Sequence, residues 1–133
     1  MHGLHLLAEL HDCQDGLDLL ADAGQARGIL TAMVSGQGLT VVGQQWHQFH
    51  AEPPAADLGV PSVQQAGWTG VILLAESHLA IHTWPERQAL TFDVFVCNHS
   101  CDNRDKARSL AARLLALWRP RHHVMREVDR RLD

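Results

Sequence analysis

Three apolar segments follow one another closely in the second half of the chain, and their spacing constrains the fold more than any other feature. The segments read TGVILLAE, HLAIHTWP and ALTFDVFVC, at residues 69–76, 78–85 and 89–97. Each has the length and the β-branched or aromatic content of a strand. The breaks between them are too short for a crossover helix, so consecutive strands must run in opposite directions. The segments therefore predict three neighbouring antiparallel strands.

Hydrophobic periodicity predicts the other elements. The chain has 133 residues, which is enough for one domain with a modest core, and we expect a single domain over residues 1–133. Two helices are too few to cover both faces of a sheet, so the predicted fold class is α+β, a two-layer sandwich of a mostly antiparallel sheet with helices on one face. The further elements are strands at 3–10, 39–49 (with an irregularity at Gly43) and 122–128, a loop at 51–67, and helices at 15–34 and 102–118, the second capped by Asp102 or Asn103.

Composition excludes several classes of protein. The N-terminus lacks the pattern of a signal peptide, and no run of apolar residues is long enough to span a membrane. Three cysteines without a secretory context indicate reduced thiols and a cytoplasmic location. Residues 101–133 hold nine of the eleven basic side chains, but these alternate with acids and lack interleaved aromatics. We therefore expect a solvated helix face or a contact between subunits, and neither a nucleic-acid nor a membrane partner.

The segment ESHLAIHTWPE, residues 76–86, carries more reactive side chains than an ordinary strand. Three interpretations without a family assignment are weak. Ser77, His82 and Asp93 could form a hydrolase triad, but no Gly-x-Ser-x-Gly turn is present. A zinc site built on Cys97, His99 and Cys101 with His122 and His123 has loose spacing, and no metal is expected. The histidines could also be partly buried polar residues of a binding module.

The whole pattern resembles the bacterial and archaeal S-adenosylmethionine decarboxylase proenzymes. The resemblance rests first on Glu-Ser-His-Leu-x-Ile-His-Thr-Trp-Pro-Glu at 76–86, followed by Asp-Val-Phe-x-Cys at 93–97. It extends to Gly-x-His-Leu-x-x-Glu at 3–9, to Asp12 and Cys13, and to Trp-His-x-Phe at 46–49. It implies decarboxylation of S-adenosylmethionine to the aminopropyl donor of spermidine biosynthesis.

The resemblance also implies a self-made pyruvoyl cofactor, the carbonyl that such a decarboxylase needs for a Schiff base with the substrate amine. Ser77 would attack the carbonyl of Glu76, and autocatalytic cleavage would give chains 1–76 (beta) and 77–133 (alpha). His82 would be the proton acceptor in processing and Cys97 the proton donor in decarboxylation. Thr69 stands where the family commonly has a serine whose hydroxyl assists processing.

Further implied roles concern the substrate and the assembly. Phe49 would stack on adenine, Glu86 would bind the ribose hydroxyls, and Glu9 and His78 would lie nearby. The working unit would be a homodimer of cleaved protomers, with two alpha and two beta chains and sites at the subunit interface.

The sequence departs from the family at the loop 50–68, which is longer than expected, and at Arg87, where a neutral residue often stands. These positions concern substrate contacts more than cofactor formation. Two alternatives therefore stay open: a pyruvoyl-dependent decarboxylase of another amino acid, such as ornithine or arginine, and a non-catalytic partner subunit.

Overall fold

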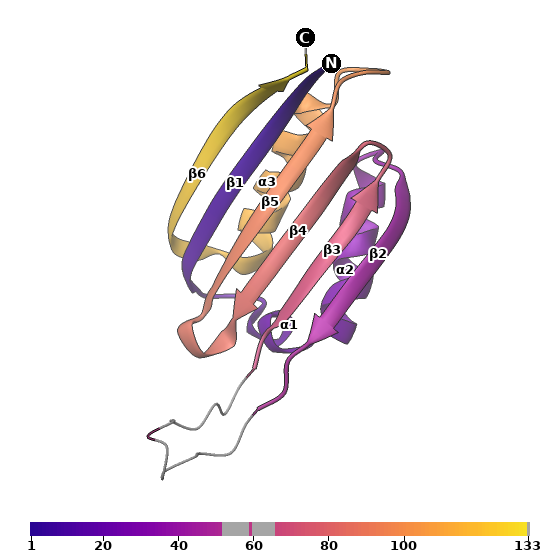
Figure 1. The fold of residues 1–133 in the computed structure, drawn as a ribbon. Coiled ribbons are helices and arrows are strands. Elements are labelled where there is room, and N and C mark those ends of the chain that lie inside the picture. Colours follow the sequence, from indigo (N-terminus) through magenta and orange to yellow (C-terminus); the bar gives the residue numbers. More distant parts are fainter. Residues whose placement is uncertain (52–58, 60–65, 133) are drawn as a thin grey trace.

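The computed structural model describes residues 1–51, 59 and 66–132. Its six strands form one sheet in the order β2-β3-β4-β5-β1-β6, and every neighbouring pair is antiparallel (Figure 1). The elements are β1 His2–Cys13, α1 Leu17–Ala21, α2 Ala23–Gly36, β2 Val41–Gln48, β3 Trp68–Leu74, β4 Ser77–Trp84, the 3₁₀ turn η2 Pro85–Arg87, β5 Ala89–Cys97, α3 Arg104–Trp118 and β6 Pro120–Arg131. The prediction that β3, β4 and β5 are antiparallel neighbours is confirmed.

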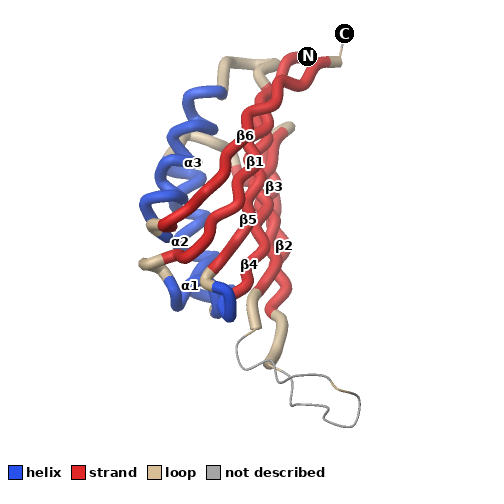
Figure 2. The backbone as a smooth tube through the Cα atoms, turned by 90° about the vertical axis from the view of Figure 1, so that its left-hand side faces the viewer, coloured by secondary structure: helices blue, strands red, loops and turns tan. Residues whose placement is uncertain are grey.

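The helices lie together on one face of the sheet, as Figure 2 shows edge-on. The core lies between that face and the helices, where alternate strand residues such as Leu6, Ile81 and Phe92 meet Leu30 of α2 and Leu114 of α3. A two-layer α+β sandwich with helices on one face is therefore confirmed. Among the described residues, no helix is both long and apolar enough to cross a bilayer.

The predicted helix at 15–34 is wrong as a single element, because Asp22 divides it into α1 and α2. Asp22 has extended backbone angles, and its side chain accepts a hydrogen bond from the Gln25 amide at 3.1 Å. An aspartate at this position caps the new helix by satisfying an amide that the helix itself leaves unpaired. The cap predicted for α3 is partly right: Asn103 occupies the N-cap position but makes no side-chain cap bond there.

Strands at the two ends of the chain run further than hydrophobic periodicity predicted. The first begins at His2 and ends at Cys13, and the last extends from Pro120 to Arg131. The two strands pair along nearly their whole length. Backbone hydrogen bonds therefore extend β6 beyond the segment that contains its few apolar residues. The predicted irregularity at Gly43 is confirmed as a register shift between β2 and β3. The predicted loop at 51–67 lies mostly outside the described residues.

Buried hydrogen bonds fix the lower ends of β3 and β4 in Figure 1 to helix α1. The Thr83 hydroxyl donates to the carbonyl of Leu20 at 2.7 Å and accepts from the Trp68 amide at 2.9 Å. The Trp68 indole donates to the carbonyl of Leu19 at 2.7 Å. These bonds satisfy polar groups that α1 leaves unpaired at its end. These bonds hold β3 and β4 in place, and both strands carry residues of the candidate site.

Candidate active site

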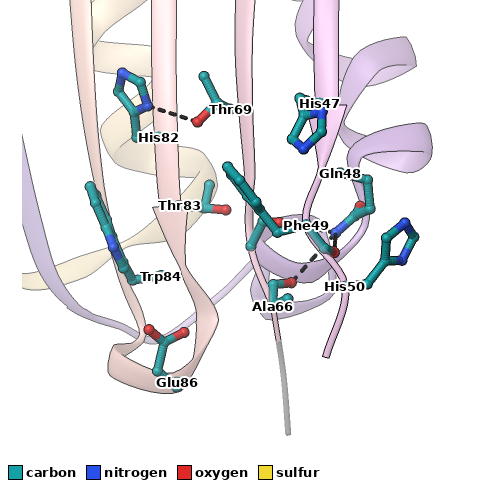
Figure 3. Close-up of a pocket in the computed structure, with 11 residues that line it drawn as sticks. His47, Gln48, Phe49, His50, Ala66, Thr69, His82, Thr83, Trp84 and Glu86 are labelled. Atoms are coloured by element: carbon teal, nitrogen blue, oxygen red, sulfur yellow. Dashed lines mark hydrogen bonds between the residues drawn. The ribbon is translucent and has the colours of Figure 1, made fainter. Parts of the chain in front are cut away.

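An open pocket of about 650 Å³ lies at this end of the sheet, between β2, β3, β4 and η2 (Figure 3). It brings together four of the predicted site residues, which come from three separate segments of the chain. These are Phe49, Thr69, His82 and Glu86. The structure thus gathers the predicted adenine, ribose and processing residues in one place.

Thr69 and His82 are opposite each other in the β3–β4 ladder. The Thr69 Oγ1 and the His82 Nδ1 are 2.9 Å apart, which is hydrogen-bond distance. The imidazole is exposed, on the face of the sheet away from the helices. Because Thr69 occupies Nδ1, the Nε2 of His82 is left to exchange a proton with another group.

Phe49 and Glu86 stand at the rim of this pocket. Phe49 is 50% exposed, and its backbone amide donates to the carbonyl of Gly67 at 3.0 Å. An exposed phenylalanine next to a pocket is available to a flat ligand, whereas a core phenylalanine is not. Glu86 belongs to η2, which begins with Pro85, and its carboxylate lies across the pocket from the ring (Figure 3).

Among the further aromatic side chains of the pocket to which sequence reasoning assigned no role are Trp84 and His47. Trp84 is 41% exposed, and the His47 ring meets that of Phe49 edge-on with centroids 4.7 Å apart. The sequence held a signal for both. His47 and Phe49 are two residues apart in a strand, and Trp84 is two residues from His82, so each pair shares a face.

The predicted cleavage site lies at the other end of β4, in the two-residue turn that joins it to β3. Leu74 pairs with Ser77, which leaves Ala75 and Glu76 in the turn. Glu76 has a φ of 58°, a left-handed conformation that a residue with a side chain rarely adopts. The peptide that would be cut therefore follows a residue under backbone strain, which is typical of functional positions.

Ser77 and Cys97 are in direct contact. Ser77 is buried, and its Oγ accepts a hydrogen bond from the Cys97 amide at 3.0 Å. Both residues line a cavity of about 190 Å³ beneath the turn, together with Glu76. The predicted cofactor precursor and the predicted proton donor are thus neighbours in space, although 20 positions separate them in the sequence.

Within one chain, Ser77 and His82 are far apart. Five residues of extended strand separate their Cα atoms by about 16 Å. Ser77 is buried and His82 exposed, and an odd spacing puts their side chains on opposite faces of the sheet. A single chain therefore does not bring the predicted base to the predicted cleavage site.

Between the two ends, the face without helices carries His78, which was a predicted site residue, and His5, which belongs to the motif at 3–9 but was given no role. The two rings lie edge-on with centroids 6.1 Å apart, and each contacts Phe95. Burial is the main cause that lowers the pKa of His78, with His5 and Arg130 adding to it and Asp93 opposing it. His5 Nε2 is buried without a hydrogen-bond partner among the described residues. Only the registers of β1 and β4 on β5, which place His5 and His78 on either side of Phe95, reveal this cluster.

Two other predicted residues, Glu9 and Asp93, have different surroundings. Glu9 is on the same face but outside the pocket, with its carboxylate bound by Arg126 at 3.0 and 3.2 Å. Asp93 lies 3.8 Å from His5, and His82 bonds to Thr69, so the residues of a hydrolase triad are not together. In the part of the chain that the structure describes, no three His, Cys, Asp or Glu side chains converge as a metal site.

Comparison with known proteins gives consistent matches. The family model described as S-adenosylmethionine decarboxylase matches residues 4–131. A proenzyme of that name from Archaeoglobus fulgidus is 32% identical over 126 residues, covering 92% of this chain and 95% of the relative. One from a Hydrogenobaculum species is 38% identical over 95 residues, but these span only 59% of that relative's length. The crystal structure of adenosylmethionine decarboxylase from Aquifex aeolicus has a TM-score of 0.76 and 29% identity, covering 98% of this chain and 92% of that one.

Proposed function

This chain belongs to the S-adenosylmethionine decarboxylase family, and we propose that it is a proenzyme which cleaves itself and then decarboxylates S-adenosylmethionine. The product would be the aminopropyl donor for spermidine biosynthesis. One observation carries the proposal: the Ser77 Oγ accepts a hydrogen bond from the Cys97 amide, next to the strained residue Glu76. The fold thereby joins the two segments of the signature that would supply the cofactor and the catalytic proton.

The residues present fit a pyruvoyl group at position 77. The serine that would form it is held by a backbone donor and lines a cavity with Cys97. The pyruvoyl ketone would supply the electron sink for the carbanion left by loss of carbon dioxide, because no ordinary side chain can accept that electron pair. Cys97 is 8% exposed, and its thiol would hold the proton that the α-carbon takes up afterwards.

Self-cleavage would proceed through this chain's own residues. The Ser77 hydroxyl attacks the Glu76 carbonyl carbon, and the amide becomes an ester. A base then removes the Ser77 α-proton, the bond between Cβ and Oγ breaks, and Glu76 leaves as a carboxylate. Hydrolysis of the dehydroalanine at position 77 releases ammonia and leaves the ketone. The base in this scheme is His82, whose Nδ1 is bound to Thr69.

Because His82 of the same chain lies about 16 Å along the strand, the scheme requires a second copy. The face of the sheet without helices supports this, because no helix of the described residues covers it (Figure 2) and its strands present apolar side chains on it. These are Leu7, Val71, Leu73, Ala80, Phe95, Val124 and Val128. A two-fold axis across the strands would lay the Ser77 end of one sheet over the partner subunit's His82. The proposed working unit is therefore a homodimer of cleaved chains with composite sites.

The two halves of such a site have complementary roles. The Ser77 end supplies the cofactor and Cys97, while the pocket of the other copy supplies Phe49 and Glu86 for the nucleoside. Ornithine and arginine have neither an adenine ring nor a ribose, so the exposed Phe49 opposite Glu86 favours S-adenosylmethionine over them. A silent partner subunit is less favoured because Ser77, His82 and Cys97 are all retained. The free state of all three cysteines supports a cytoplasmic location.

The intact mass of freshly purified protein tests the cleavage, with Ser77→Ala as the control. The expected result is two fragments that meet between residues 76 and 77, a carbonyl-reactive end on the smaller one, and an uncut control. Release of labelled carbon dioxide from carboxyl-labelled S-adenosylmethionine, ornithine and arginine then tests the substrate. A chain that stays uncut on prolonged incubation would contradict the proposed mechanism, and release only from ornithine or arginine would contradict the substrate.

A further inference from the structure

The chain has a single lysine, Lys106, and it lines the cavity under the proposed cleavage site. All ten other basic residues are arginines. Among the described side chains around this cavity, Lys106 is the only basic one and Glu76 the only acidic one. No ion pair joins Lys106 to a carboxylate within residues 1–51, 59 and 66–132. A cation without a counter-ion is unusual beside such a cavity, because partial burial disfavours an unpaired charge.

Lys106 is connected to the cleavage site through one loop. Its ammonium group donates to the carbonyl of Gly38 at 3.4 Å, a long hydrogen bond. Two residues further along, the carbonyl of Thr40 accepts from the amide of Ala75 in the β3–β4 turn at 3.1 Å. Helix α3, the loop and the turn therefore surround the same space. Because the bond from Lys106 to the Gly38 carbonyl is weak, the ammonium group is able to bind a stronger acceptor that forms in this space.

Cleavage creates such an acceptor. When the Ser77 Cβ–Oγ bond breaks, the former carbonyl of Glu76 becomes an α-carboxylate, so a neutral peptide is replaced by an anion at the cavity wall. We infer that Lys106 is the counter-ion of this new carboxylate and holds the end of the 1–76 chain in place. The inference rests on the proposed self-cleavage and concerns the state that follows it. Charge-assisted hydrogen bonds of this kind are about twice as strong as neutral ones.

A double comparison of variants tests the role. Lys106→Met and Arg113→Met each remove one positive charge from α3, but Arg113 is exposed and does not line the cavity. Each is made in the cleavable chain and in the uncut Ser77→Ala chain, and apparent Tm is measured at one protein concentration. Lys106→Met should lower Tm by about 4 °C in the cleaved protein and leave the uncut protein unchanged. Arg113→Met should shift the Tm of the cleaved and the uncut protein by the same amount. Lys106→Arg, which keeps the positive charge, should recover most of the Tm that Lys106→Met loses.

Because the lysine is unique, its reactivity gives a second readout that does not depend on unfolding. Sulfo-NHS acetate at pH 8 should acetylate Lys106 about threefold more slowly in the cleaved protein than in Ser77→Ala, since a neighbouring carboxylate keeps the ammonium protonated. Peptide mass spectrometry after digestion reads the modification directly.

The outcomes separate the two proposals. A wild-type chain that is never cut refutes self-cleavage and the role of Lys106 together. A chain that is cut, but in which Lys106→Met lowers Tm equally in both backgrounds, leaves self-cleavage standing and shows that Lys106 only holds the Gly38 loop. A Lys106→Met chain that is not cut would assign the lysine to the cleavage step and overturn the inference.

Discussion

His78 is the second residue after the proposed scissile bond, and its surroundings make its protonation unfavourable. Burial and the neighbouring His5 and Arg130 lower its pKa, against the opposing charge of Asp93. The unfolded chain, with an ordinary histidine pKa of 6.5, therefore binds a proton more readily than the folded chain does. The resulting stability is fully present above about pH 6.5 and is lost as the pH falls toward the folded pKa.

We predict that Ser77→Ala, which stays a single chain, loses thermal stability between pH 7 and pH 5. His78→Gln in the same background should lose less over this range, because glutamine has no proton to gain. Differential scanning fluorimetry at intervals of about half a pH unit, the spacing needed to follow one titration, measures the slope. Equal slopes for the two proteins would show that His78 does not contribute to this pH dependence.

At the scale of one element, a glycine in helix α2 and a glycine just before strand β3 have opposite effects on stability. Gly28 lies on the exposed side of α2, where an added Cβ would meet nothing within 4 Å. Gly67 leads into β3 and touches the backbone of Thr83, so an added Cβ would collide with the Thr83 carbonyl oxygen. Glycine at 28 only weakens a helix, whereas at 67 it permits a close approach beside the pocket.

Gly28→Ala should stabilise the protein by about 0.5–1 kcal/mol, because alanine loses less conformational entropy in a helix. Gly67→Ala should destabilise it by about 1–3 kcal/mol, the usual cost of overpacking, and should disturb the Thr83 bonds that fix β4. Urea denaturation of both variants in the Ser77→Ala background measures the two free energies. If Gly67→Ala left the free energy of unfolding unchanged, the backbone at residue 67 would be able to move away from Thr83 without cost, and the predicted collision would be wrong.

At the scale of the whole molecule, the separation of Ser77 from His82 makes processing depend on two chains. Ser77→Ala and His82→Ala should each be uncut when produced alone. When they are produced together in equal amounts, a mixed dimer places the intact Ser77 of one chain against the intact His82 of the other. About half of the His82→Ala chains should then be cut, the fraction expected in mixed dimers from random pairing.

Mass spectrometry distinguishes the chains, since the two variants differ in mass. Cleavage of the His82→Ala chain only in the mixture would support a composite site, and the Ser77→Ala chain should remain intact throughout. Cleavage of His82→Ala alone, or no cleavage in the mixture, would contradict the role of His82 across the interface.

The sequence by itself determined the local elements and the chemistry of the signature. Short connections forced antiparallel pairing of β3, β4 and β5, and a periodic apolar stripe marked α3. The family resemblance identified Ser77, His82 and Cys97 because their motif is contiguous or nearly so. The break at Asp22 was not evident, since α1 and α2 continue one apolar pattern and only the cap separates them.

Only the tertiary structure decided which of these residues meet. The β4–β5 register joins Ser77 to Cys97, and the pairing of both β1 and β4 with β5 brings His5 beside His78. The tertiary structure also placed Lys106 beside the turn that contains Glu76. The loop at Gly38, which Lys106 contacts, lies outside the motifs at 76–86 and 93–97. Pairing between distant strands is chosen by the burial of one whole face of the sheet, because a slip of one residue would turn every side chain to the other face. That choice depends on all six strands and both long helices together, and no segment of the sequence carries it alone.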